Sequence, residues 1–426
     1  MNASKRKKNV DIVVYLLICT ISILSIFFAN PIILFTEVSV ILLILIFRAK
    51  FSFFSILSFL LWYSYLQEIL RIYIGVTQNT LAWAGQKMPI YFKELTVSTV
   101  SFFLIALFFV NFTTIIDREK KLYALNISPS LDISLILIVI SIILIILVFP
   151  SFPTFRVASE SVRRTQGFSS LYGLVLLSLL LSGITVDQGL HHNWLLLGYL
   201  FLVFWSFGHG ERIEVMGFLI YYALKYFNQP IDIKNKKRVL RRRVLMISIV
   251  SGFVLIFGIW LGLVREGRVS SVNFSEILFN LLQQGTAGDV VYVFNCATDL
   301  WKNGNALHGL TYIDYLLRLI PGGADTFSAA VVIQDFYLTM GGGLFYAEPM
   351  MNFGIIGVII MNLEFFLVMK LILFKVTKFR AYFWIPIVIE IFRTAWYGRG
   401  AWLLACFVEI PIIYFMMKLI KNNSKI

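Results

Sequence analysis

The sequence predicts an all-α polytopic membrane protein, a helical bundle with about twelve membrane-spanning helices. Of its 426 residues, 59% are hydrophobic, and the mean hydropathy of +0.83 lies well above that of soluble globular chains. Apolar runs long enough to cross a bilayer recur along the chain, and helices satisfy their own backbone hydrogen bonds inside lipid. These observations favour a single integral-membrane domain over residues 1–426.

The membrane helices are expected at the longest apolar runs. The expected ranges are 12–29, 31–47, 51–67, 95–116, 133–149, 171–186, 194–207, 213–226, 244–264, 346–373, 381–395 and 401–417. Before the tenth helix, residues 264–345 are expected to form a large, partly helical loop. Within it, 274–282 and 312–320 are amphipathic and are predicted to be helices lying on the membrane surface.

The positions of the basic residues predict the orientation of these helices. Lys and Arg number 37, and 24 of them lie on the side of the termini and of the links 48–50, 117–132, 187–193, 227–243 and 375–380, when Lys225 and Lys370 near the ends of their helices are included. By the positive-inside rule that side is cytoplasmic, with 227–243 as a basic cytoplasmic loop and 264–345 as an extracytoplasmic one. The net charge of +14 therefore reflects topology, and no nucleic-acid partner is expected. We expect a multi-pass protein of the cytoplasmic membrane, in contact with its lipids, with both termini cytoplasmic.

Arginine is concentrated on the outer side of this topology. There arginine outnumbers lysine ten to three, whereas inside lysine outnumbers arginine sixteen to eight. The outer arginines are Arg71, Arg156, Arg163, Arg164, Arg212, Arg265, Arg268, Arg318, Arg393 and Arg399. A planar guanidinium binds phosphate or carboxylate in a bidentate manner that an ammonium cannot match, so the set favours an anionic ligand. For Glu68/Arg71 and Glu390/Arg393, whose i,i+3 spacing suits helical ion pairs, a structural role is the alternative.

The sequence lacks the motifs of several other kinds of functional site. There is no DxD pair and no GxxxxGK[ST] loop, and His191, His192 and His209 lack metal-ligand spacing, so neither a metal nor a cofactor is expected. Residues 187–192 are expected to form a solvated cytoplasmic loop. An outward-facing enzyme has no nucleotide sugar available, so its substrate must arrive already activated, most naturally as a lipid-linked pyrophosphate.

Segments in the second half of the chain carry a family resemblance. They are PheGlyHisGlyGluArg (207–212), ArgGluGlyArg (265–268), GlyLeuThrTyr (309–312) with Pro321, and AlaGluProMetMetAsnPheGlyIleIleGly (347–357). These segments are similar to the G-x-R, G-x-[ST]-Y…P and E-x-x-x-N-[FW]-G-x-x-G patterns of the Wzy-type oligosaccharide repeat-unit polymerases. The resemblance to this O-antigen and capsular polysaccharide polymerase family covers about residues 150–400. Pro349 departs from the residues that family members often carry there.

The resemblance implies a metal-independent glycosyltransferase on the outer face of the membrane. Its substrates would be undecaprenyl-pyrophosphate-linked oligosaccharides, and the growing chain would be transferred as a block onto a single lipid-linked repeat unit. A chain-length regulator and a flippase of the same pathway are the implied partners.

Residue chemistry within these segments gives a candidate site. Glu348, an acid at the outer mouth of an apolar helix, is the candidate base, with Arg212 and Arg265 as catalytic partners that stabilise the leaving pyrophosphate. The other candidate binding residues are Arg268 and Arg399 for the phosphates, Arg156, Arg163 and Arg164 for guiding the lipid-linked chain, His308 as a lesser proton acceptor, and Tyr312 and Tyr397 for stacking on sugars. Glu348 has a structural alternative, in which it pairs with an outer arginine.

Two other functions stay open at this stage. A polysaccharide ligase shares the expected fold and donor chemistry, and only the family resemblance separates it from a polymerase. A lipid-linked oligosaccharide flippase or transporter would need charged groups at the bilayer midplane and often paired halves, and most expected helices are uncharged. A smaller question concerns Gly341–Gly343, whose backbone N–H groups form either an anion-binding nest or a hinge.

Overall fold

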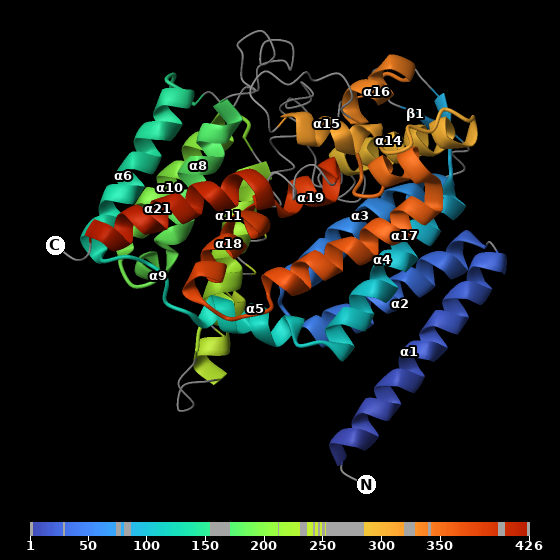
Figure 1. Ribbon diagram of the computed structural model, residues 1–426, viewed down its shortest axis with the longest axis horizontal. Coiled ribbons are helices and arrows are strands. Elements are labelled where there is room, and N and C mark those ends of the chain that lie inside the picture. The colour runs from blue at the N-terminus through green and yellow to red at the C-terminus, as the bar shows by residue number, and fades with distance from the viewer. Residues whose placement is uncertain are drawn as a thin grey trace. The chain divides into compact units, whose positions relative to one another are not determined.

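The fold is that of a helical, membrane-embedded protein (Figure 1). The computed structural model describes residues 3–28, 30–73, 78–80, 87–153, 171–211, 213–230, 237–241, 243–245, 248, 252, 285–318, 329–339, 342–398 and 405–423. Five of the described helices are long and apolar enough to cross a membrane. They are α2 (Pro31–Ala49), α3 (Phe53–Tyr73), α4 (Phe92–Phe112), α6 (Leu131–Val148) and α17 (Ala347–Ile372).

Shorter apolar helices account for other predicted spans. They are α1 (Ala3–Phe28, apolar over Asp11–Phe27), α8 (Leu171–Ile184, apolar over Leu174–Ile184) and α10 (Asn193–Gly208). The helix bounds agree with the predicted ranges to within a few residues at most ends. Most of the predicted span 244–264 lies outside the described residues, so the total of about twelve spans stays a prediction.

The chain divides into two compact units, and the first contains Met1–Arg118, Gln283–Phe374 and Arg393–Ala401. Helices α1 to α4 and α17 lie side by side in this unit, with α4 packed against both α2 and α17 (Figure 1). The long buried side of α4 includes Phe102, whose ring contacts those of Phe345 and Phe366 at 5.6 and 5.2 Å between centroids. Tightly interlocked aromatic rings therefore form the core of the first unit.

The predicted large loop contributes three helices to the first unit. They are α14 (Gly285–Lys302), α15 (Leu310–Arg318) and α16 (Ala329–Phe336). Helix α15 confirms the amphipathic helix predicted near 312–320, whereas 274–282 lies outside the described residues. Helix α14, which we did not predict, packs against α3 and α17 and buries Cys296, whose thiol pKa is raised by that burial. A two-stranded antiparallel ribbon, β1 (Gln78–Thr80) with β2 (Lys87–Pro89), lies near α14.

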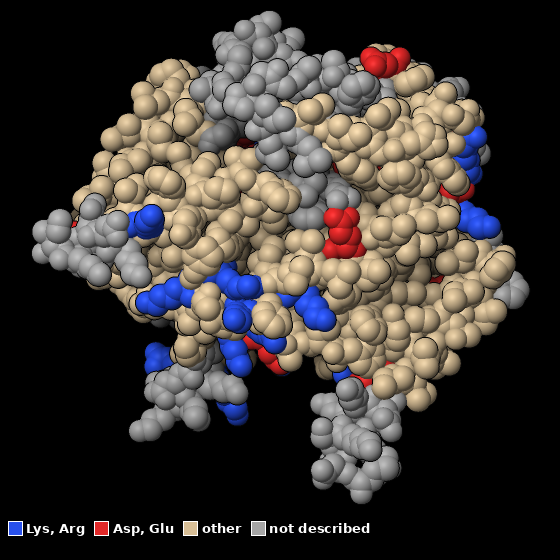
Figure 2. All heavy atoms as spheres, in the orientation of Figure 1, with Lys and Arg blue, Asp and Glu red and all other residues tan. Residues whose placement is uncertain are grey.

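The second unit contains Glu119–Leu282, Lys375–Phe392 and Trp402–Ile426. In it, α6 packs against α8 and α10, and α11 (Ile213–Asn228) packs against α8 and α18 (Lys378–Ile389). The chain ends in a short π-helical segment (Ala405–Glu409) that continues as α21 (Ile410–Asn423). Figure 2 shows Lys and Arg side chains gathered where α5 (Ile115–Ala124) and the start of α18 lie.

The predicted span 381–395 is interrupted in the structure. Helix α18 ends at Ile389, Glu390 has φ −81° and ψ 13°, and α19 (Ile391–Tyr397) begins after it. Pro386 inside α18 lacks an amide N–H and crowds the preceding turn, but α18 continues past it, and Glu390 donates its N–H to the Pro386 carbonyl at 2.8 Å. The i,i+3 spacing of Glu390 and Arg393 therefore spans a helix break, and the two residues belong to different units.

A testable consequence concerns the contact between α11 and α18. A Cβ atom added at Gly217 would lie 1.7 Å from the carbonyl oxygen of Ile389, so the two helix backbones approach closely only because Gly217 has no side chain. We expect Gly217→Ala to destabilise the protein by about 1–3 kcal/mol, the usual effect of overpacking. Thermal unfolding in detergent measures this, with Gly252→Ala as control, because nothing lies within 4 Å of the corresponding position. Equal melting temperatures for both variants would contradict the close approach.

Candidate functional site

The candidate site residues that the structure describes gather around the first turns of α17, in the first unit. Helix α17 begins at Ala347, and Glu348 and Asn352 lie one turn apart on the same face. Pro349 is tolerated between them because the first amide N–H groups of a helix have no helical partner. The departure from the family pattern at this position therefore leaves the helix intact.

Asn352 joins this helix to the turn before α15. Its Oδ1 accepts the N–H of Gly309 at 2.7 Å, and its Nδ2 donates to Thr311 Oγ1 at 2.8 Å and to the Glu348 carbonyl at 2.9 Å. The turn depends on positive φ at His308 (48°) and Gly309 (93°), a conformation that glycine adopts readily. The segments 309–312 and 347–357, which the resemblance singled out separately, are thus in direct contact.

Gly354 gives α17 a kink two residues beyond Asn352. Its φ of 64° and ψ of −153° are not helical, and an added Cβ atom would lie 2.3 Å from Trp301 Cε2. Trp301, at the end of α14, thus occupies the space that a side chain would fill. Next to the kink, the Phe353 ring lies 6.2 Å from that of Tyr312. The glycine of the N-[FW]-G pattern here has a defined structural role.

The segment before α17 is held by the end of α19. Gly343 donates its N–H to the Trp396 carbonyl at 2.9 Å, and Phe345 donates to the Ala395 carbonyl at 2.9 Å. The Gly343 N–H is therefore occupied by protein, which argues against an anion-binding nest at this residue. Tyr397 is 40% exposed, and its ring lies 5.5 Å from the guanidinium carbon of Arg393.

The candidate residues differ sharply in exposure. Glu348 is 4% exposed, Tyr312 is half-buried, and His308 and Tyr397 are exposed. Electrostatic interactions of a carboxyl group sequestered from water are much stronger than those of an exposed one. Glu348 is thus the most sequestered of the described candidate residues.

The remaining candidate residues lie outside the described part of the chain. They are Arg156, Arg163, Arg164, Arg212, Arg265, Arg268 and Arg399. Their roles stay predictions. Among the described arginines that were predicted to lie on the outer side, Arg71 pairs with Glu68, as the alternative interpretation of their spacing expects, with Nη1 3.6 Å from Oε2.

Sequence reasoning missed a polar cluster near this site. The Asp299 carboxylate, on α14, accepts the phenol O–H groups of Tyr91 and Tyr337 and the Asn303 side-chain N–H. Burial and the neighbouring carboxylate raise the pKa of both tyrosines, which therefore stay protonated donors. Tyr91 and Asp299 are 208 positions apart, so no local sequence pattern predicts their contact.

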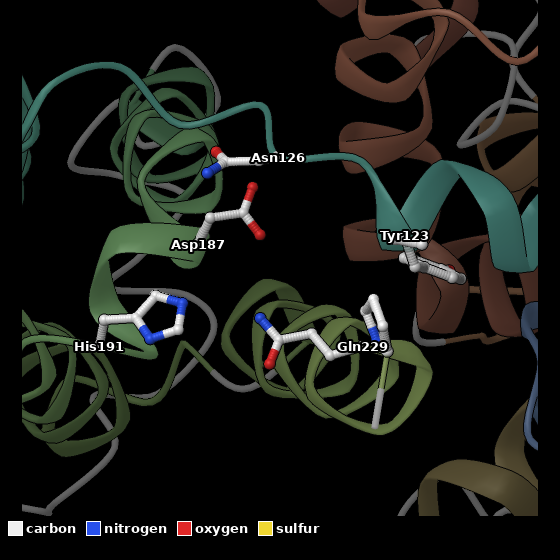
Figure 3. Close-up of a pocket in the computed structure, with 7 residues that line it drawn as sticks. Tyr123, Asn126, Asp187, His191 and Gln229 are labelled. Atoms are coloured by element: carbon white, nitrogen blue, oxygen red, sulfur yellow. The ribbon is translucent and has the colours of Figure 1, made fainter. Parts of the chain in front are cut away.

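A cavity of about 210 Å³ lies in the second unit (Figure 3). Figure 3 shows Asn126 above Asp187, with His191 and Gln229 below them and Tyr123 to the right. Asp187 was expected in a solvated loop, and this expectation is wrong. Its Oδ1 lies 2.9 Å from Lys225 Nζ, its Oδ2 accepts the Ile127 N–H at 2.8 Å, and both charged side chains are at most 6% exposed.

The sequence could not reveal this pair because Asp187 and Lys225 lie on different elements, α9 (Val186–Gly189) and α11. Lys225 also donates to the Leu125 carbonyl. The pair therefore fastens α9, α11 and the chain after α5 together, and the cavity lies between these segments.

Comparison of the chain with protein-family models, curated proteins and solved structures finds no match. Within the described residues, no group of three or more His, Cys, Asp and Glu side chains is placed to hold a metal ion.

The Asp187–Lys225 pair provides one prediction. Lys225→Met leaves a buried carboxylate uncompensated, and breaking such a pair destabilises a protein by about 3–5 kcal/mol. Adding Asp187→Asn should restore most of this stability, because the charge is gone while an amide oxygen still accepts the Ile127 N–H. Chemical unfolding in detergent compares the three proteins. A double variant as unstable as Lys225→Met would contradict the ion-pair explanation.

A second prediction concerns Asn352. Asn352→Ala removes the acceptor of the Gly309 N–H and the donor to Thr311, which should release the turn from α17 at a cost of about 1–3 kcal/mol. Hydrogen exchange of peptides covering 305–312 should accelerate at least tenfold, a change that corresponds to a free energy within this range. Asn303→Ala is the control, because its exposed side chain bonds only to Asp299, four positions away. Unchanged hydrogen exchange in Asn352→Ala would contradict the role of Asn352 in holding the turn against α17.

Proposed function

We propose that the protein is an outer-face glycosyltransferase that polymerises undecaprenyl-pyrophosphate-linked oligosaccharide repeat units into a surface polysaccharide. The growing chain is transferred as a block to a lipid-linked acceptor repeat. The proposed location is the cytoplasmic membrane, with both termini on the cytoplasmic side and the start of α17 on the outer side.

One observation carries this proposal. The Asn352 carboxamide bonds the Gly309–Thr311 turn to the helix that bears Glu348. These residues belong to the segments 309–312 and 347–357, whose resemblance to the polymerase family was found independently in each. Contact between the two segments, one turn from a buried acid, supports their serving a common site.

The proposed reaction needs a base and a stabilised leaving group. A hydroxyl of the acceptor sugar attacks the anomeric carbon of the donor, forming a new glycosidic C–O bond while the bond to the pyrophosphate breaks. The hydroxyl proton passes to the Glu348 carboxylate, and undecaprenyl pyrophosphate departs with the bonding electrons. Arg212 and Arg265 place positive charge where negative charge develops on the diphosphate. No metal is required in this scheme.

The binding residues divide by the part of the substrate they serve. Arg268 and Arg399 join the phosphate contacts, while Arg156, Arg163 and Arg164 guide the charged end of the lipid-linked chain. Tyr312 and Tyr397 provide faces on which sugar rings stack, and His308 is a secondary proton acceptor. A chain-length regulator and a flippase of the same pathway are the proposed partners.

The deciding experiment uses the purified full-length protein with synthetic lipid-pyrophosphate repeat units. Separation of the products by gel should give a ladder at repeat-unit spacing. A single coupled product would instead identify a ligase of the same fold. Movement of the lipid-linked unit across vesicles without any new glycosidic bond would identify a flippase, and either result would overturn the polymerase proposal.

The roles of Glu348 and Arg212 provide the next prediction. Glu348→Gln should keep substrate binding but slow transfer by about 10²–10⁴-fold, the usual contribution of a positioned base.

Arg212→Ala and Arg265→Ala should abolish chain growth at normal protein levels, and Arg212→Lys should rescue poorly because one ammonium cannot replace a two-pronged contact. Turnover in the ladder assay is the measurement.

The matched control is Glu364→Gln, on the same helix but far from its first turn. Unchanged turnover in Glu348→Gln would make Glu348 structural. Full-length polysaccharide from Arg212→Ala and Arg265→Ala would remove the arginine assignment.

A further inference from the structure

The cavity in the second unit is bounded by connecting segments of the chain (Figure 3). Its lining comes from the end of α5 and the chain after it, from Asp187 and His191, and from the two residues after α11. These segments fall within the links 117–132, 187–193 and 227–243, all of which are predicted to lie on the cytoplasmic side. A cavity at this level is expected beside the lipid headgroups of the inner leaflet.

Three polar side chains of the lining are available to a ligand. The carboxamides of Asn126 and Gln229 and the imidazole of His191 form no hydrogen bond with any residue that the structure describes. Asn126 and His191 are exposed and Gln229 is half-buried, whereas Asp187, which lies between them in Figure 3, is 5% exposed. The cavity therefore offers hydrogen-bonding groups at the surface of the protein and closes on a buried ionic group.

Arg243 is a buried cation next to the cavity. It is 5% exposed, and its Nη1 donates to the carbonyls of Phe227 and Gln229 at 3.0 and 2.9 Å. The guanidinium carbon lies 5.2 Å from the centre of the Tyr226 ring. Among the described residues no carboxylate pairs with this guanidinium, and its Nε is buried without a hydrogen-bond partner. A positive charge is therefore fixed against the backbone of a lining residue, without a matching acid.

Capping of α11 is the alternative explanation of Arg243. The C-terminal end of a helix carries about half a negative charge, which offsets only part of a full positive charge. The hydrogen bonds to Phe227 and Gln229 use Nη1 alone, and a lysine would serve for them. Lys225 and Asp187, 2.9 Å apart, balance each other. The buried groups around the cavity therefore carry a net positive charge, whose field is weakly screened away from water.

Exposed basic residues lie on two of the segments that form the cavity. Lys121 is exposed on α5, and Lys237, Arg238 and Arg241 are exposed on the segment that leads to Arg243. Clusters of Lys and Arg at a cytoplasmic membrane surface attract anionic lipid headgroups. A phosphate group accepts hydrogen bonds from amide and imidazole N–H groups, and the hydroxyl groups of a headgroup donate to amide oxygens. The lining and the charge thus fit a phosphate-bearing ligand that also has hydroxyl groups.

We infer that this cavity binds the phosphate and hydroxyl groups of an anionic phospholipid headgroup from the inner leaflet. Asn126, His191 and Gln229 make the contacts, and Arg243 provides the buried positive charge beside them. Soluble phosphate esters of the cytoplasm share this chemistry, and the experiment below separates the two sources. The inference rests on the predicted cytoplasmic side of the membrane but not on the proposed polymerase reaction.

Calorimetry on the purified full-length protein in detergent tests the site. The probe is short-chain phosphatidylglycerol, with short-chain phosphatidylcholine, glycerol 3-phosphate and inorganic phosphate for comparison. The wild-type protein should bind phosphatidylglycerol at least about tenfold more tightly than each of the other three. His191→Ala combined with Gln229→Ala should weaken this binding at least about tenfold, because two hydrogen bonds to the headgroup are lost. His192→Ala is the matched control, because the neighbouring histidine does not line the cavity, and it should bind normally.

A second variant tests the buried charge. Arg243→Gln keeps an amide donor for the carbonyls of α11 but removes the positive charge, and it should lose phosphatidylglycerol binding at least about tenfold. The melting temperature without lipid checks the fold of every variant, and the His191 and Gln229 variant carries the test if Arg243→Gln is unstable.

Three results would overturn the inference. They are wild-type affinity in the combined His191→Ala and Gln229→Ala variant, equal binding of phosphatidylglycerol and phosphatidylcholine, and an equal loss of binding in His192→Ala. Tighter binding of glycerol 3-phosphate than of phosphatidylglycerol would assign the cavity to a soluble phosphate ester and would also overturn the lipid site.

The ladder assay separates this inference from the proposed function. Product ladders from a protein whose cavity variants bind phosphatidylglycerol normally would reject the lipid site and leave the polymerase intact. Phosphatidylglycerol binding that depends on His191 and Gln229, in a wild-type protein that forms no glycosidic bond, would reject the polymerase and support the lipid site.

Discussion

The Asn352 side chain joins the Gly309–Thr311 turn to the start of α17, and the candidate site exists only while this joint holds. The carboxamide is 1% exposed, so water does not replace these hydrogen bonds when they break. Each bond contributes only about 0.5–1.5 kcal/mol net, but leaving its partner buried and unsatisfied costs more. Because Asn352 also donates to the carbonyl of Glu348, the residue that positions the turn also fixes the backbone of the candidate base.

Buried charge is handled in the same way in both units. Glu68 has Arg71 and Asn295 as partners in the first unit, and Asp187 has Lys225 and the Ile127 amide in the second. Desolvating such groups is unfavourable, and the attraction within a pair offsets this only with good geometry and further hydrogen bonds. The two pairs differ in exposure. The Lys225 side chain is 1% exposed, whereas the Arg71 side chain is 24% exposed, so water screens the pair in the second unit less.

Much of the helical fold follows from local sequence. The apolar runs predicted α2, α4, α6 and α17 closely, because a helix in lipid needs only length and hydrophobicity. The interruption at Glu390 and the kink at Gly354, where Trp301 occupies the space of a side chain, are not encoded in a hydropathy pattern. The sequence pointed to Glu348 and, through the E-x-x-x-N pattern, to Asn352, but it did not predict the contact between Asn352 and Gly309. Asp299 and Asp187 were missed because their partners lie far away in the chain.

The same reasoning explains which part of the candidate site the sequence could suggest. Residue type carries chemical information by itself, so an excess of arginine over lysine on one predicted face indicates an oxyanion before any contact is known. The position of an arginine in the sequence does not carry the same information. Whether the arginine neutralises an acid or binds a ligand depends on which residues pack against its guanidinium and on how much of the side chain is exposed. Arg71 illustrates this: its partner Glu68 is buried, the backbone of Gly288 borders its guanidinium, and about a quarter of its side chain is exposed. The i,i+3 spacing of an acid and an arginine therefore predicts the ion pair, whereas the rest of the guanidinium's contacts depend on residues far away in the chain.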